Sequence, residues 1–340
     1  MTQSNKTVRQ NAALRALAPG DRFCGYYLLK SALNGTASNG RPYLNLRLAD
    51  VSGEIPGKFW DYGGPVGAAD AGQPVWASGR VETYQNALQV SLDDLRLTDA
   101  DDEVDLGQIV PVAPYDAQQM LRYVESALEK LEDADYRAVC LAVLERHRED
   151  FALLPGGKTM HHAFLHGLLM HTATMMRQAD FLARQYPDVV DRCLLVAGAF
   201  LHDVGKIEEY TTTALGLVSD YSKEGQLLGH VFLGAEEVGA AAREAGIPEE
   251  KRLLLQHLIL SHHGKPEFGA AVLPKCPEAE LLSEIDMIDS RMEMFRTAFA
   301  DTPAGEFSRQ RVYGLNNSSV YHPAAGSAPE AAPVPETSNE

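Results

Sequence analysis

The 340-residue chain is predicted to fold as two unlike domains, a small five-stranded β-barrel and an all-α domain, followed by a disordered tail. Three observations predict this. The apolar residues change from a period of two to a helical period near residue 100, the acidic run DADDEVD marks the change, and the chain ends in a Pro-rich and Ala-rich segment. We place the parts as follows: barrel 17–98, acidic linker 99–113, helical domain 114–300 and tail 314–340.

The barrel is predicted from short β-rich runs that are separated by Gly, Asn, Asp and Pro. Five such runs lie between residues 20 and 98, which suits a small closed barrel. The alternation in YLNLRLAD places Leu44, Leu46 and Leu48 on one face of a strand. We therefore expect these three leucines in the barrel core.

The helical domain begins in YDAQQMLRYVESALEKL, with Asp116 as the expected N-cap. Helical patterns continue to about Phe299. The tail beyond them lacks the apolar residues that a packed core requires, so we expect it to be disordered.

The composition indicates a protein of the cytoplasm. Hydrophobic residues make up 45% of the chain, yet no apolar run reaches the roughly 18 residues that a membrane-spanning helix needs, and residues 1–20 show no signal pattern. We therefore expect no membrane partner. The four cysteines are scattered without a CxxC pair, which indicates neither a disulfide framework nor a thiolate zinc site.

The formal net charge of −17 argues against a strongly basic surface for a polyanion. The charge is uneven, however, because residues 99–105 alone carry −5. Residues 20–98 contain seven Lys and Arg and eight Asp and Glu, so their charge is 7 − 8 = −1. The barrel can bind a nucleic acid, but base stacking rather than charge would have to dominate.

Histidines and aspartates that end or interrupt apolar helical segments predict a metal site. In LLVAGAFLHD, for example, a histidine and an aspartate follow a run built for burial, where unpaired polar groups are costly. One such histidine would be explained by a structural hydrogen bond, whereas several segments that each present one favour metal binding. The candidate ligands are His171, His202, Asp203, His230, His262, His263 and Asp286.

The order H…HD…H…HH…D, with the HD inside LHDVGK, resembles the HD-domain metallophosphohydrolases in their two-metal form. Longer motifs in both predicted domains resemble the YhaM family of 3′→5′ exoribonucleases. In the helical domain they are FALLPGGKTMHHAFLHGLLMHT, EGQLLGHVFLG and LILSHHGKPEFGA, and in the barrel they are NGRPYLNLRLADVSGEIPGKFWD and GRVETYQNALQVS. This resemblance covers about residues 17–300 and implies an OB-fold barrel followed by an HD domain. His166 and Met170 depart from the family pattern, but neither matches a metal-ligand position.

The resemblance implies two divalent transition-metal ions. Manganese is the expected metal, and iron, cobalt, nickel and zinc are the alternatives. His171, His202, Asp203 and Asp286 would hold one ion, and Asp203, His230, His262 and His263 the other. Asp203 can serve both ions, and Asp289 is the alternative to Asp286. Asp203, His202 and Lys206 are the expected catalytic residues. Lys206 would contact the scissile phosphate unless it is a solvated cation at a helix end.

Phosphodiester hydrolysis is the reaction that such a site predicts. The resemblance supplies the 3′→5′ polarity: hydroxide attack assisted by two metals would release nucleoside 5′-monophosphates from the 3′ end of single-stranded RNA, and single-stranded DNA is a further candidate substrate. Two other functions fit parts of the pattern, a phosphodiesterase of cyclic dinucleotides or nucleotides and a single-strand-binding protein without turnover. The sequence leaves the oligomeric state open, a homo-oligomer included.

The expected contacts to the strand are aromatic and basic side chains of the barrel, because OB barrels stack bases on exposed rings. They are Tyr43, Trp60, Tyr62 and Tyr84, with Arg41 and Lys58 beside the backbone path. Phe59 and Trp60 are neighbours on a strand, so at most one faces inward. His161 and His162 are expected to contact the substrate or to support the ligands, and His147, His257 and His322 to be structural or surface residues.

Overall fold

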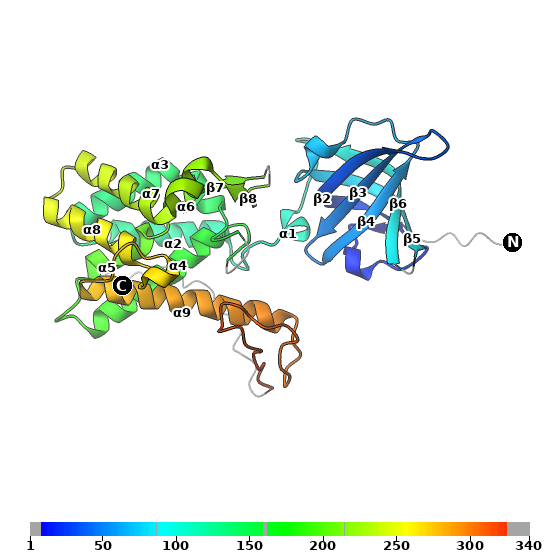
Figure 1. Ribbon diagram of the computed structural model, residues 1–340. Helices are drawn as coiled ribbons and strands as arrows, with labels where there is room; N and C mark the ends of the chain where they lie inside the picture. Colours follow the sequence, from blue (N-terminus) through cyan, green and yellow to red (C-terminus); the bar gives the residue numbers. More distant parts are fainter. Residues whose placement is uncertain (1–7, 86, 159–161, 214, 325–340) are drawn as a thin grey trace. The chain divides into compact units, whose positions relative to one another are not determined.

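The computed structural model describes residues 8–85, 87–158, 162–213 and 215–324. The chain divides into two compact units, the first ending at Val112 and the second beginning at Ala113, except that Thr213 and Leu215 are grouped with the first. Each unit has a hydrophobic core of its own, so each is described by itself (Figure 1). The strands of the first unit end at Leu97, and the first long helix of the second unit begins at Ala117.

The first unit is a closed barrel. Its strands are β1 (Val8–Gln10), β2 (Arg22–Thr36), β3 (Pro42–Asp50), β4 (Gly53–Trp60), β5 (Pro74–Tyr84) and β6 (Ala87–Leu97). The order β2-β3-β4-β6-β5 is closed by pairing of β5 with β2, and β4 and β6 run parallel. Five strands closed in this order form the predicted OB-fold, to which the short β1 adds one parallel strand beside β2.

The long strand β2 closes the barrel because it pairs with two neighbours in turn. Its first half pairs with β5 and its second half with β3, and the register shifts between Leu29 and Ser31. A bulge of this kind bends a strand and increases its twist, as a small barrel requires. Leu44, Leu46 and Leu48 on β3 point into the core, which confirms the period-two prediction.

The segment predicted as an acidic linker folds onto the barrel instead. Asp102 accepts two hydrogen bonds from the Arg96 guanidinium, at 2.6 and 2.7 Å, and one from the Tyr26 hydroxyl at 2.8 Å. Asp105 caps the short helix α1 (Leu106–Ile109). The prediction treated the run as a linker, whereas Arg96, on the last strand of the barrel, forms ion pairs with Asp102 and Asp99.

The second unit is helical, with one short hairpin that was not predicted. The helices are α2 (Ala117–Glu129), α3 (Ala134–Leu153), α4 (Gly167–Gln185), α5 (Arg192–Leu201), α6 (Lys206–Glu209), α7 (Lys223–Glu244), α8 (Glu249–Ser261) and α9 (Pro277–Ala300); the hairpin is β7 (Tyr210–Thr212) and β8 (Val218–Tyr221). Asp116 caps α2 as predicted, accepting from the amide of Gln119 at 2.7 Å. Among the described residues, no helix is long and apolar enough to span a bilayer.

Gly205 allows the turn after α5 to contact α7 directly. A Cβ placed on Gly205 would lie 2.1 Å from the carbonyl oxygen of His230 and 2.5 Å from the amide nitrogen of Gly234. Both of these atoms belong to the backbone, so they cannot rotate away as a side chain could. A residue without a Cβ is therefore required where the two segments meet.

Part of the predicted tail packs against the helical unit. The ring of His322 stacks on Phe299 of α9, with centroids 4.4 Å apart and 5° between the planes, and its Nδ1 donates to the carbonyl of Thr302 at 2.6 Å. Val320 is buried. Aromatic and branched side chains before residue 323 supply this packing. Residues 325–340 lie outside the described part of the chain.

Candidate metal centre and nucleic-acid surface

All seven predicted ligands come together in the second unit. They are His171 in α4, His202 and Asp203 directly after α5, His230 in α7, His262 and His263 directly after α8, and Asp286 in α9. Helix α4 packs against α5 and α9, and α8 packs against α5, α7 and α9. The packing of five helices thus brings together residues more than a hundred positions apart.

Asp203 lies at the centre of this cluster, almost completely buried. Its Oδ2 lies 3.3 Å from Nε2 of His202 and 3.7 Å from Nε2 of His171. Its Oδ1 lies 3.7 Å from Nε2 of His230 and 3.8 Å from Nε2 of His262. The two oxygens therefore face two different groups of imidazoles, the arrangement that a carboxylate shared by two ions requires.

Hydrogen bonds behind four of the imidazoles direct their Nε2 atoms toward Asp203. In His171, His202, His230 and His262 the Nδ1 atom lies 2.7 to 3.0 Å from an acceptor oxygen. These acceptors are the carboxylates of Asp289 and Glu209 and the backbone carbonyls of Ala199 and Ile259. An Nδ1–H donated in this way leaves the Nε2 lone pair available, as in metal-bound histidines.

The donor set fits divalent ions. Nε2 of His171 and Nε2 of His202 are 3.1 Å apart, close to the separation of about 3.0 to 3.4 Å between two nitrogens that bind one ion at about 2.1 Å. Nε2 of His262 is buried and has no hydrogen-bond partner in the described residues. The donor atoms of His230, His262 and His263 lie within 4.8 Å of one another. Buried nitrogens so close together are costly unless a cation or a proton lies between them.

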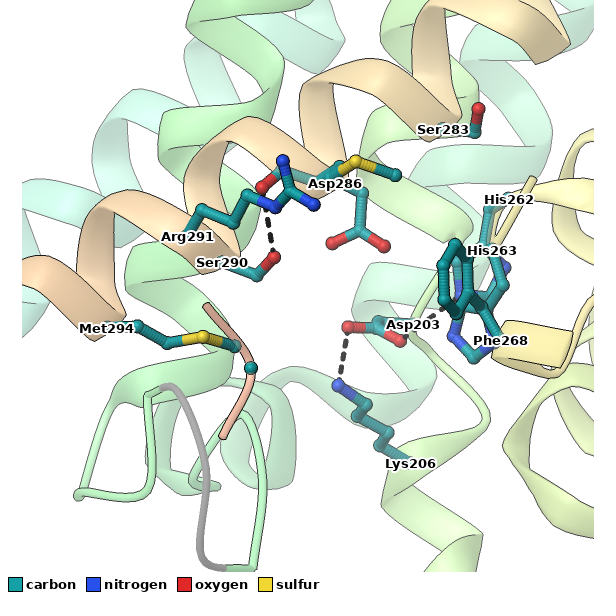
Figure 2. A pocket seen from close by; sticks show the side chains of 12 residues that line it. Asp203, Lys206, His262, His263, Phe268, Ser283, Asp286, Ser290, Arg291 and Met294 are labelled. Carbon is teal, nitrogen blue, oxygen red and sulfur yellow. Dashed lines mark hydrogen bonds and ion pairs between the residues drawn. The ribbon is translucent and has the colours of Figure 1, made fainter. Parts of the chain in front are cut away.

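Lys206 and Asp203 form a buried ion pair at the floor of a cavity of about 310 Å³. The Lys206 ammonium lies 2.7 Å from Oδ2 of Asp203 and donates to the carbonyl of Gly156 at 2.6 Å. Burial opposes both charges, but their attraction outweighs it: the pKa of Asp203 is held well below its usual value and the pKa of Lys206 is raised. Figure 2 shows both side chains facing Asp286 across the cavity. Lys206 is therefore not a solvated helix-end cation.

Asp286 and Asp289 occupy different positions around His171. Oδ1 of Asp286 lies 3.3 Å from Nε2 of His171, on the side of the cavity. Oδ2 of Asp289 lies 2.7 Å from Nδ1 of the same ring and 2.8 Å from Nε2 of His162. Asp289 thus supports His171 from behind, which leaves Asp286 as the acid that faces the cluster.

His162 does not fit the predicted contact to nucleic acid, because it is buried and bonded to Asp289. It fits the other expectation, a support for the ligands. His161 lies outside the described residues. His147, His257 and His322 each contact protein groups outside the cluster, as expected of structural residues.

Glu209 was missed by the sequence analysis. Gly229, with φ 72° and ψ 156°, interrupts helix α7. The next residue, His230, makes two contacts with Oε1 of Glu209. Its backbone amide and its Nδ1 each lie 2.9 Å from that oxygen. The sequence signal was an acid six residues after Asp203, which alone does not identify its partner.

Replacing Glu209 with Ala is expected to weaken the binding of one ion, since the loss of such a supporting carboxylate typically costs about 10 to 100-fold in metal affinity. Isothermal titration calorimetry of the metal-free protein with Mn²⁺ measures this affinity. Glu208→Ala, an exposed neighbour, is the matched control. Equal affinities in the two variants would exclude the proposed role of Glu209.

The barrel presents a stacking surface at the β3–β4 pair. Trp60 is 47% exposed, and its ring lies 5.4 Å from the half-buried Tyr43. Nζ of Lys58 lies 4.9 Å from the Trp60 ring centroid and 5.3 Å from that of Tyr43. Tyr84 is also exposed, and Arg41 is exposed in an ion pair with a neighbouring acid.

Tyr62 is a correction to the predicted surface. It is buried against the barrel core, its hydroxyl accepts from the amide of Val66 at 2.8 Å, and its ring lies 4.9 Å from that of Phe59. Phe59 therefore faces inward and Trp60 outward, a choice that strand alternation alone leaves open.

Comparisons with known proteins found a matching family model, curated relatives and solved structures. The family model described as HD domain matches residues 168–291. The 3′-5′ exoribonuclease YhaM of Listeria monocytogenes serotype 4b is 37% identical over 304 residues, which cover 88% of this chain and 94% of that protein. The protein of the same name from Oceanobacillus iheyensis is 35% identical over 89% of this chain and 95% of that protein. Among solved structures, the second OB-fold domain of replication protein A from Methanococcus maripaludis aligns with 28% of this chain and 100% of its own, at 18% identity and a TM-score of 0.21.

Proposed function

Because this chain belongs to the YhaM family of 3′→5′ exoribonucleases, we propose that it is itself a metal-dependent 3′→5′ exoribonuclease. The observation that carries this proposal is the position of Asp203, whose two oxygens face two groups of imidazoles. Neither other function accounts for all the features. A cyclic-dinucleotide phosphodiesterase does not need a strand-binding barrel, and a binding protein without turnover does not need a complete ligand set.

We assign the seven ligand-type residues to two ions, as the family resemblance implies. His171, His202, Asp203 and Asp286 would hold one ion, and Asp203, His230, His262 and His263 the other. Bound divalent ions supply positive charge to the phosphodiester and lower the pKa of water near neutrality. Manganese is the proposed metal. The cytoplasmic location of the protein stays a prediction from the sequence.

Residues of the chain itself prepare this site. Lys206 keeps Asp203 ionised and adds a positive charge beside the place where a phosphate would lie. Asp289 and Glu209 hold His171 and His230 in the tautomer that presents Nε2. These contacts are made by the protein itself and fix the orientation of the two rings.

The substrate is proposed to be single-stranded RNA, captured on Trp60, Tyr43 and Lys58 of the barrel. Stacking on exposed rings does not discriminate strongly between bases, which suits an enzyme that degrades a strand one nucleotide at a time. The rings and the Lys58 ammonium offer no contact that is specific for a 2′-hydroxyl. Single-stranded DNA therefore remains a second substrate to be tested.

The direct test is incubation with Mn²⁺ and a 5′-labelled oligoribonucleotide. A ladder that shortens from the 3′ end, with release of nucleoside 5′-monophosphates, is the expected result, and a strand whose 3′ end is chemically blocked should resist. Internal cleavage, or faster hydrolysis of a cyclic dinucleotide than of the RNA, would contradict the proposal.

Replacing Trp60 with Ala is expected to raise KM for a long single strand by about 5 to 150-fold, because stacking is worth ~1–3 kcal/mol per base. Since stacking contributes equally before and during the chemical step, kcat should change little. Steady-state kinetics on a long strand and on a mononucleotide ester measure this. Leu33→Ala removes an exposed apolar side chain without an aromatic ring from the same barrel and is the control. An equal loss on both substrates would show that Trp60 supports the fold instead.

A further inference from the structure

The segment after α9 forms a loop that reaches the metal cavity. We call residues 305–322 the C-terminal loop. Its two arms are joined by backbone hydrogen bonds from Gly305 to His322, from Ser308 to Val320 and from Val312 to Ser318, at 2.7 to 2.9 Å. Gly314, near its tip, lines the same cavity as Asp203 and Asp286.

The base of the loop is anchored to the helical unit. The His322 ring stacks on Phe299 and bonds to the carbonyl of Thr302, and Val320 is buried. The tip turns through Asn316 and Asn317, which have positive φ values of 58° and 50°. Asparagine is one of the few residues besides glycine that adopt this conformation readily. The loop is therefore a built element of the cavity wall.

The side chains near the tip have the chemistry of a strand-binding surface. Tyr313, next to the cavity-lining Gly314, is 81% exposed. Residues 303–324 contain two arginines and one acid, so their charge is 2 − 1 = +1 in a chain of −17. Arg309 and Arg311 on the loop have no carboxylate partner among the described residues.

Among the described residues, a third cation without a carboxylate partner lines the cavity. Arg291, on α9, lines the cavity beside Ser290 (Figure 2). It too lacks a carboxylate partner in the described part of the chain, although acids outnumber basic residues in the sequence by 47 to 30. Exposed aromatic residues are common singly. Here, however, the exposed Tyr313 directly precedes the cavity-lining Gly314, and Arg291, a cation without a carboxylate partner in the described residues, lines the same cavity.

We propose that the C-terminal loop binds the 3′-terminal nucleotides of the strand as they enter the cavity. Tyr313 stacks on a base, and Arg311 and Arg291 neutralise phosphates on either side of the entrance. This inference rests on the proposed exonuclease function and adds a second binding surface, separate from the barrel. The loop belongs to the same unit as the metal site, so a strand that reaches the metal site also reaches the loop.

Substrates of two lengths distinguish the contribution of the C-terminal loop from that of the barrel surface. Tyr313→Ala is expected to raise KM at least about five-fold for a trinucleotide as well as for a long strand, because one stacked base is lost in both. Trp60→Ala should affect the long strand alone. Tyr313→Phe keeps the ring and should behave as the wild type. Tyr186→Ala, which removes an exposed tyrosine at the end of α4, is the control for general surface effects.

Binding of a hydrolysis-resistant phosphorothioate trinucleotide tests the loop independently of turnover. We expect Tyr313→Ala to bind it at least about five-fold more weakly than wild type, with unchanged thermal unfolding, because an exposed ring contributes little packing. Equal binding by wild type and Tyr313→Ala would overturn the inference. Absence of RNA hydrolysis by the wild type would overturn the proposed function instead, while the binding comparison would still decide the role of the loop.

Discussion

Replacement of Asp203 by Asn is expected to reduce exonuclease turnover on the order of 10⁴-fold or more, as loss of a residue central to a catalytic unit does. Asp203 is buried, and each of its oxygens faces a different pair of imidazoles. An amide keeps one acceptor oxygen and turns an NH₂ group toward the other pair. It also leaves the buried ammonium of Lys206 without its counter-charge, which is costly in a site removed from water.

Metal analysis of the purified variant distinguishes loss of ions from loss of chemistry alone. We expect Asp203→Asn to retain at most one ion per chain where the wild type holds two. Asp289→Asn is the informative companion, because that acid supports His171 without facing the cavity. It should lower metal affinity by only about 10 to 100-fold. If Asp203→Asn keeps both ions, Asp203 does not bridge them.

Replacement of Gly205 by Ala is expected to be strongly destabilising for a change of a single methyl group. The new Cβ would lie 2.1 Å from the carbonyl oxygen of His230 and 2.5 Å from the amide of Gly234. Overpacking against atoms that cannot rotate away costs about 1 to 3 kcal/mol, or a drop in Tm of roughly 2 to 12 °C for a domain of this size. Because the contact is with His230 itself, metal binding should weaken as well.

Thermal unfolding followed by circular dichroism, with metal content measured in parallel, tests this prediction. Gly63→Ala is the matched control, since a Cβ at that position of the barrel meets no atom within 4 Å. A Gly205→Ala protein with the wild-type Tm and metal content would show that the turn and α7 can separate without consequence. The close approach would then not be needed to position His230.

Local patterns in the sequence were sufficient to predict the two domains and the ligand types. Alternation is a property of neighbouring residues, so Leu44, Leu46 and Leu48 could be assigned to the barrel core before any pairing was known. Asp116 was recognisable as an N-cap because a cap bonds within its own first turn. The histidines and aspartates stood out because each interrupts an apolar helix, and the family resemblance supplied the polarity of the reaction.

Contacts between distant segments could not be predicted in this way. Asp286 and Asp289 are three residues apart on one helix, and only the packing of α4 against α9 shows that one faces the cavity while the other lies behind His171. The inward position of Phe59 and Tyr62 depends on how the sheet closes. Glu209 reaches His230 because Gly205 lets two segments touch. Periodicity reports which face of an element is apolar, whereas the partner of each polar side chain is decided by the tertiary packing that brings it within hydrogen-bonding distance.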